Sequence, residues 1–173
     1  MMNRFVRAAR HLRSCLIIII VMTGCLSVAG HLAAAADSTQ HVARHLYDRV
    51  MDEFRQRDYE AALSGFRFFL ELHGQSALAS NAQYWIGECQ YRLGRYKDAL
   101  DSFYTVLSYY PLSPKLPAST LKIGQAYTKL GDKEKARMMY ERVVDQYPDM
   151  TEAEVARRAL DLYGVKNEPV TPE

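Results

Sequence analysis

The stretch from Ala82 to Pro111 reads AQYWIGECQYRLGRYKDALDSFYTVLSYYP, and the chain on both sides repeats its pattern. A shift of 37 positions relates small, aromatic, aliphatic and helix-ending residues at the same time. The equivalent sets are Ala62, Ala99 and Ala136; Phe66, Phe103 and Tyr140; Leu70, Leu107 and Val144; Gly87 and Gly124; Gly94 and Gly131; and Pro111 and Pro148. Because one fixed period explains all these positions, the sequence predicts an array of repeats.

Apolar residues recur at helical spacing in every repeat and predict two helices per unit. Asp58 is placed to cap its helix, and Gly74 is expected to end that helix in the left-handed conformation. Gly87 lies within a helix at a cost of about 1 kcal/mol relative to Ala, which a close approach of Ala99 would explain. The expected helices are 38–56, 59–72, 76–94, 96–109, 120–130, 133–147 and 152–163.

Two helices per unit, a small residue at their crossing and a closing Pro resemble the tetratricopeptide repeat, whose usual period is about 34 residues. The longer period here can be absorbed by longer helices or joints. We therefore predict an all-α tetratricopeptide solenoid of three helix pairs, with the helix at 152–163 as a C-terminal cap.

Residues 1–36 have the order of a secretory signal peptide, because a basic start is followed by an apolar run and then by small residues. An uncleaved membrane anchor is the alternative for this segment. The expected domains are the signal peptide at 1–36, the repeat domain at 37–163 and a flexible tail at 164–173. A periplasmic location follows from this reading.

Met22-Thr23-Gly24-Cys25 resembles a bacterial lipobox, in which the cysteine is lipidated and becomes the new N-terminus. Lipidation at Cys25 would make the protein an outer-membrane lipoprotein, and membrane contact is expected only in that case. The mass of the mature protein distinguishes this alternative from cleavage after Ala36.

The charge beyond the signal peptide argues against a polyanion partner such as nucleic acid. All acidic residues and all but four basic ones lie after Ala36, leaving 18 basic and 20 acidic side chains. Cys89 is then the one remaining cysteine, so an internal disulfide is excluded and a small buried thiol is the expected role.

No pattern of catalytic residues stands out in the sequence. The glycines follow the helix architecture rather than a phosphate loop, and the acidic residues suit outer helix faces. His41 and His45 lie four residues apart, but no third ligand accompanies them. We therefore expect neither an enzyme nor a protein with a metal or cofactor.

The amino-acid sequence of the central repeats resembles the C-terminal domain of the YbgF/CpoB family, the periplasmic tetratricopeptide protein of the Tol-Pal system. The resemblance spans about Tyr47 to Leu160. The residues that carry it are Phe69-Leu70, Asn81-Ala82, Tyr84 to Glu88, Leu121 to Gly124, Tyr127 and Leu130-Gly131.

This resemblance implies an envelope scaffold that couples outer-membrane constriction to septal wall synthesis during cell division. Its partners would be Tol-Pal or wall-synthesis components. Only about twenty residues lie between the signal peptide and the helix at 59–72, too few for the family's N-terminal coiled coil, so trimerisation is not inferred. A lipid-anchored repeat component of an outer-membrane assembly complex is the alternative.

The first helix of each pair lines the concave face of such a solenoid, and we predict that a partner peptide or helix binds there. The predicted groove residues are Tyr47, Met51, Phe54, Asn81, Tyr84, Glu88, Tyr91, Arg92, Leu121, Gln125 and Lys129. Packing of Tyr84 and Tyr91 between neighbouring helices is the alternative role for these two rings. For Trp85 we expect core packing between the two helices of its own repeat.

Overall fold

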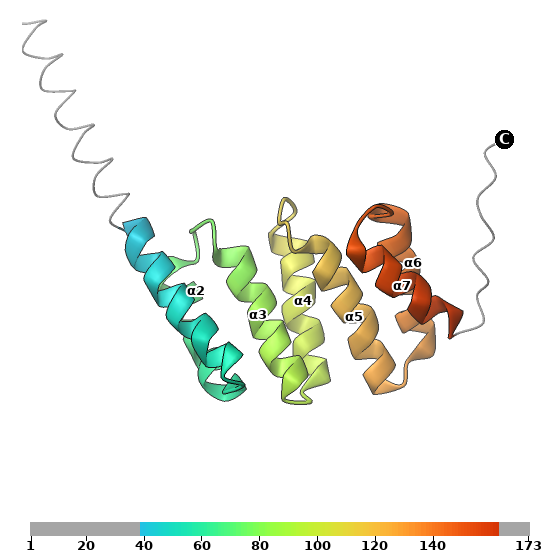
Figure 1. Cartoon of the computed structure of the whole chain (residues 1–173), viewed down its shortest axis with the longest axis horizontal. Helices are drawn as coiled ribbons and strands as arrows, with labels where there is room; N and C mark the ends of the chain where they lie inside the picture. The colour runs from blue at the N-terminus through green and yellow to red at the C-terminus, as the bar shows by residue number, and fades with distance from the viewer. Residues whose placement is uncertain (1–38, 163–173) are drawn as a thin grey trace, which may run out of the picture. The chain divides into compact units, whose positions relative to one another are not determined.

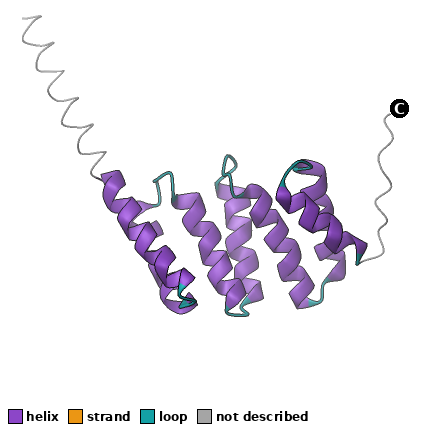
Figure 2. Ribbon diagram, in the orientation of Figure 1, coloured by secondary structure: helices purple, strands orange, loops and turns teal. Residues whose placement is uncertain are grey.

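The computed structural model describes residues 39–162. The signal peptide, the Cys25 motif and the tail lie outside this range, so their assignments stay predictions. The chain divides into the units Met1–Val42 and Ala43–Glu173, and the second holds the repeat array. All regular structure in the described range is helical, as Figure 2 shows.

The described helices agree closely with the expected ones. A first helix covers residues 39–55. It is followed by α2 (Tyr59–His73), α3 (Ala79–Arg92), α4 (Tyr96–Tyr109), α5 (Leu116–Leu130), α6 (Lys133–Gln146) and α7 (Thr151–Asp161). The helix expected over 120–130 begins at Leu116, because Pro117 stands in its first turn, where a missing N–H is tolerated.

The helices form two alternating sets. We call residues 39–55, α3, α5 and α7 the A-type helices, and α2, α4 and α6 the B-type helices. From α2 to α7, each helix packs on the next one in the chain. Figure 1 shows the resulting stack, in which A-type helices lie side by side in one layer and B-type helices in the other.

Residues one period apart occupy equivalent places in the core. Ala62, Ala99 and Ala136 are fully buried at the three helix crossings. Phe66, Phe103 and Tyr140 are likewise buried, and the apolar side chains around them form three successive clusters. Each cluster joins one repeat to the next, so the array is held together by neighbour contacts.

Gly87 makes room for an aromatic ring. A Cβ added to Gly87 would lie 2.6 Å from the Phe103 ring, and one added to Gly124 would lie 2.8 Å from Tyr140. The expected close approach of the next helix is therefore present. The atoms nearest to the added Cβ belong to the ring of Phe103, one turn after Ala99 in the same helix.

The turn between the two helices of a repeat has one residue with a positive φ, at the equivalent position in all three repeats. Its φ is +65° at Arg57, +76° at Gly94 and +81° at Gly131. Gly74 differs from the expectation, because its φ is −62°, in the right-handed region. A Cβ on Gly74 would lie 2.6 Å from the Leu70 carbonyl oxygen, so lack of space is the reason for glycine there.

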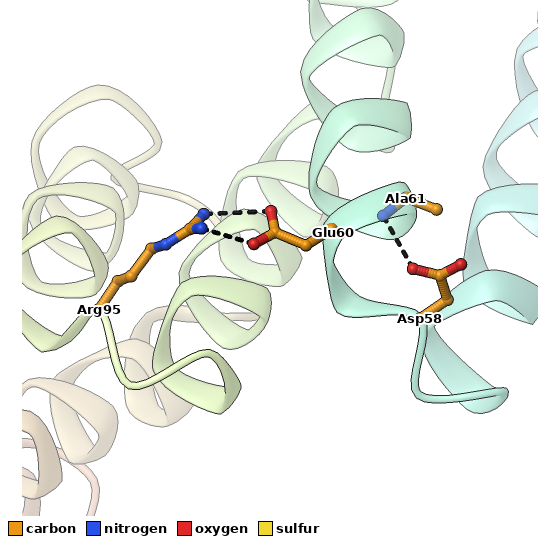
Figure 3. A network of polar contacts seen from close by, with 4 residues as sticks. All are labelled: Asp58, Glu60, Ala61 and Arg95. Carbon is orange, nitrogen blue, oxygen red and sulfur yellow. Dashed lines mark hydrogen bonds and ion pairs between the residues drawn. The ribbon is translucent and has the colours of Figure 1, made fainter.

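The residue directly before each B-type helix occupies its N-cap position. Asp58 caps α2 as predicted, accepting a hydrogen bond from the Ala61 amide, and Asp132 caps α6 in the same way. The equivalent Arg95 makes no cap. Its guanidinium instead donates two hydrogen bonds to Glu60, at 2.5 and 3.1 Å, linking α4 to α2 (Figure 3).

The stack is closed by α7. This helix buries Ala153, Ala156 and Leu160 against the last repeat and exposes charged residues such as Glu154 and Arg158. A charged outer face gives a further repeat nothing apolar to pack on, as a capping helix requires.

Candidate partner-binding face

The A-type helices carry every predicted groove residue, and the period places these residues in equivalent positions. Five of them are buried: Tyr47, Met51, Tyr84, Glu88 and Leu121, each at most 9% exposed. The Tyr84 ring packs against Phe103 and Trp85, with centroids 5.7 and 5.3 Å away. We call the surface that carries the predicted groove residues the A-helix face, and these buried residues form its floor.

The other predicted residues are open to solvent. Phe54, Asn81, Tyr91 and Gln125 are partly exposed, whereas Arg92 and Lys129 are exposed. A partner lying on the A-type helices would meet these six side chains first. Their role in binding stays a prediction.

Two lysines from α5 and its start lie over this floor, and neither was predicted from the sequence. Lys122 Nζ is 2.6 Å from Glu88 Oε1 and 5.2 Å from the Tyr91 ring centroid. Lys115 Nζ lies 5.1 Å from the Tyr84 centroid and 5.7 Å from that of Trp85. Each ammonium therefore joins the central A-type helix to the next repeat through contact with aromatic faces.

The contact of Lys122 with Tyr91 has an aromatic counterpart one period earlier. Phe54 and Trp85 lie 37 residues before Tyr91 and Lys122, and their ring centroids are 4.7 Å apart. Trp85 thus packs against the preceding repeat as well as against the cluster that contains its own partner helix α4, as expected from the sequence. An offset of 31 residues between A-type helices, as from Phe54 to Trp85 and from Tyr91 to Lys122, was the signal that could have revealed these pairs.

The phenols of Tyr84 and Tyr91 stay protonated well above neutral pH. Burial raises the pKa of Tyr84, and the nearby Glu88 carboxylate raises it further, while Arg92 lowers it. Burial also raises the pKa of Tyr91. Both hydroxyls are therefore available as neutral hydrogen-bond donors.

Cys89 is fully buried on the side of α3 that faces the first repeat. Desolvation, with a further contribution from Glu88, raises the pKa of its thiol to about 12. Because the thiolate is the reactive form, this cysteine is an inert packing residue at neutral pH, as predicted.

Residues 39–162 contain no group of three metal-binding side chains, and none of their helices is long and apolar enough to cross a membrane. A cleft of about 300 Å³ lies between the α2–α3 and α4–α5 loops. Its lining includes Ser80 and Tyr110, and no predicted groove residue contributes to it.

Two family models match the chain, both described as tetratricopeptide repeat. The first matches residues 47–117 and the second residues 118–149, so together they cover more than half of the chain.

Among curated proteins, the cell division coordinator CpoB of Pseudomonas putida is 43% identical over 42 residues. The matched stretch covers 24% of this chain and only 16% of that protein. The likeness is therefore local.

Several solved structures share the fold. The tetratricopeptide domain of Arabidopsis OM64 has a TM-score of 0.60 at 13% identity and covers 72% of this chain and 98% of its own. The first such domain of Spaghetti (RPAP3), bound to an HSP90 peptide, has a TM-score of 0.58 at 18% identity, covering 71% and 94%. The Yersinia enterocolitica chaperone SycD, in complex with a peptide of the translocator YopD, has a TM-score of 0.59 at 16% identity. The match covers 70% of this chain and 94% of SycD.

Proposed function

The chain belongs to the tetratricopeptide repeat family, and from that premise we propose that it is an exported protein-interaction scaffold of the bacterial cell envelope. The fold and family are typical of interaction modules rather than enzymes. The function therefore depends on what binds the A-helix face and on the compartment in which binding occurs.

One observation carries the assignment to the Tol-Pal system. The local identity to the cell division coordinator CpoB adds to the family resemblance in the central repeats. Coordination of outer-membrane constriction with septal wall synthesis is accordingly the proposed role. The N-terminal basic, apolar and small-residue order of residues 1–36 supports a periplasmic location.

The proposed mode of action is binding of a peptide or helix of an envelope protein on the A-type helices. The exposed and partly exposed residues there include Tyr91 and Arg92, and Tyr and Arg are among the residue types that most often anchor interfaces. Two structures with the same fold were solved with peptides bound, which supports this mode by analogy. The buried Tyr84 and Glu88 would act by supporting the surface rather than by touching the partner.

Affinity capture from envelope extracts tests the proposal. The protein is used as bait beside a variant in which Asn81→Arg and Gln125→Arg place bulky side chains on the A-helix face. The control Arg67→Ala and Met138→Ala changes exposed residues of B-type helices. We expect Tol-Pal or wall-synthesis components with the wild type and the control, and a loss with the double arginine variant. Recovery of neither class by the wild type contradicts the role.

A second candidate function follows from Met22-Thr23-Gly24-Cys25. Lipidation of Cys25 would make the protein a lipid-anchored component of an outer-membrane assembly complex. Mass spectrometry of the mature protein decides between the two, because an acylated Cys25 and a free Asp37 terminus give very different masses. A terminus at Asp37 excludes the lipoprotein.

A further inference from the structure

Exposed large apolar side chains gather at one edge of the repeat array. The α2–α3 and α4–α5 loops lie side by side there, because both line the same cleft. Figure 1 shows these loops at the top of the view and the turns before the B-type helices at the bottom. Leu72 in the last turn of α2, Tyr109 at the end of α4 and Leu112 in the following loop are each more than half exposed. Phe68, one turn before Leu72, is also exposed, and we call these four residues the apolar edge.

The two loops at this edge differ in charge from the turns at the opposite edge. The α2–α3 loop, residues 74–78, has no charged residue. Lys115 is the only charged residue of the α4–α5 loop, and its ammonium lies over the Tyr84 ring. Each turn at the opposite edge carries a charged residue such as Arg57, and Asp149 in the α6–α7 loop limits the uncharged surface to the first two repeats. Because removing a charge from water is costly, an apolar phase can cover the apolar edge more readily than the opposite one.

The chain enters the array at the same edge. Residues 43–55 run towards the turn at 56–58, so Ala43 lies at the edge that carries the loops. The apolar run at 16–28 and Cys25 precede Ala43, and the 18 residues from Cys25 to Ala43 span at most about 65 Å when extended. A membrane that holds this segment, as an anchor or through an acylated Cys25, would therefore be joined to the array at the apolar edge.

We propose that the apolar edge lies against a phospholipid membrane, with its side chains in the interfacial region of the lipids. Exposed apolar patches mark contacts with proteins or membranes, and entry of the chain at this edge favours a membrane. Phe68 and Leu72 are four residues apart, about 6 Å along the helix axis, which fits the depth of about 5–10 Å that interfacial side chains reach. Tyr109 combines an apolar ring with a polar hydroxyl, as residues at membrane interfaces often do.

The inference goes beyond the proposed function, because the contact with lipid needs no partner protein. The A-helix face is distinct from the apolar edge and stays open to a partner. The contact applies to both candidate N-termini. With a retained anchor it fixes the orientation of the array on the membrane, and with a terminus at Asp37 it is weak and reversible.

A fluorescent label at a single position tests the proposal. Leu112→Cys, labelled with the polarity-sensitive fluorophore NBD, is compared with Leu162→Cys, because both leucines are at least 89% exposed. Leu162 follows the A-type helix α7 and so lies at the opposite edge. Cys89 is buried and stays unlabelled. The mature protein purified from the envelope is mixed with vesicles of phosphatidylethanolamine and phosphatidylglycerol, and circular dichroism checks that the variants remain helical.

We expect vesicles to shift the emission of the Leu112→Cys label to the blue and a quencher attached to the lipid to reduce it, with neither effect in Leu162→Cys. Adding Leu72→Ser to the labelled Leu112→Cys protein should lower the shift at limiting lipid at least about threefold. Adding the matched change Leu130→Ser, at the exposed last residue of α5, should leave the shift unchanged.

The proposal is overturned if vesicles do not change the Leu112→Cys signal, if Leu162→Cys responds equally, or if Leu72→Ser has no greater effect than Leu130→Ser. A blue shift of the Leu112→Cys label in pure protein without lipid would assign the edge to a second copy of the chain. A shift caused only by a lipid-free extract of envelope proteins would assign it to a partner protein. Either result also overturns the membrane contact.

Discussion

Lys122 of α5 makes an ion pair with Glu88 of α3, with its Nζ 2.6 Å from Glu88 Oε1, and so links two successive A-type helices. Glu88 is 3% exposed, so this charge lies inside the array. One period earlier, the equivalent residues are Met51 and Trp85, which belong to an apolar cluster. Two successive interfaces of the same geometry are thus built with different chemistry.

Removing the cation should destabilise the array. Lys122→Met leaves the Glu88 carboxylate buried without its partner, and we expect a loss of about 3 kcal/mol in the free energy of unfolding. The double variant Glu88→Met, Lys122→Trp copies the first interface onto the second and should recover that loss or improve on the wild type. Urea unfolding followed by circular dichroism measures both. A single variant as stable as the wild type would show that the pair has no structural role.

Gly87 should tolerate a methyl group only if the facing ring is reduced. Because a Cβ would lie 2.6 Å from the Phe103 ring, Gly87→Ala overpacks the crossing and should cost about 1–3 kcal/mol in unfolding free energy. Adding Phe103→Leu to Gly87→Ala should cost less than the two single changes combined. A double-mutant cycle by urea unfolding measures this coupling, and strict additivity would refute the contact.

The helix caps offer a matched pair of positions. Asp58→Ala removes the side chain that accepts from the Ala61 amide and should lower the stability by about 1 kcal/mol. Arg95→Ala, at the equivalent position, removes only an exposed ion pair with Glu60 and should cost less than about 1 kcal/mol. Thermal unfolding of both variants measures the difference. A greater loss at Arg95 would contradict the assignment of the caps.

Alkaline pH should weaken the fold through groups that burial keeps protonated. Burial raises the pKa of Cys89 from 9.0 to about 12 and also raises that of Tyr84. The native state therefore holds these protons more tightly than the unfolded state does. The contribution of Cys89 to the unfolding free energy is fully present below about pH 9 and is lost as the pH rises towards the pKa of the folded state. Cys89→Ala should reduce the decline in unfolding free energy between about pH 9 and pH 11. An unchanged slope would show that Cys89 does not contribute to it.

Most of the fold could be predicted from the sequence because each repeat has similar residue types at equivalent positions. The period alone located Ala99, Phe103 and Gly94, and the structure gives their equivalents the same burial or dihedral angle. Errors arose where a local rule had competing causes. Gly74 could serve a left-handed turn or a tight backbone contact, and only the folded structure distinguishes the two.

The A-helix face was harder to predict, because its chemistry depends on contacts between repeats. Tyr84 and Glu88 were placed on that face by counting from Gly87, yet both are buried. Counting within one helix gives the direction of a side chain but not what covers it. Here Lys115 and Lys122 lie over the central helix, and nothing within its own repeat indicates their presence.

The central claim is that the A-type helices carry the partner-binding face, and site-specific photo-crosslinking in living cells tests it most directly. A photoreactive amino acid is placed at Gln125 or Asn81 on that face, and at Arg67 or Met138 on the B-type helices. The account predicts crosslinks to an envelope protein from Gln125 and Asn81, and none from Arg67 and Met138. Crosslinks to a partner from the B-type positions alone would contradict it.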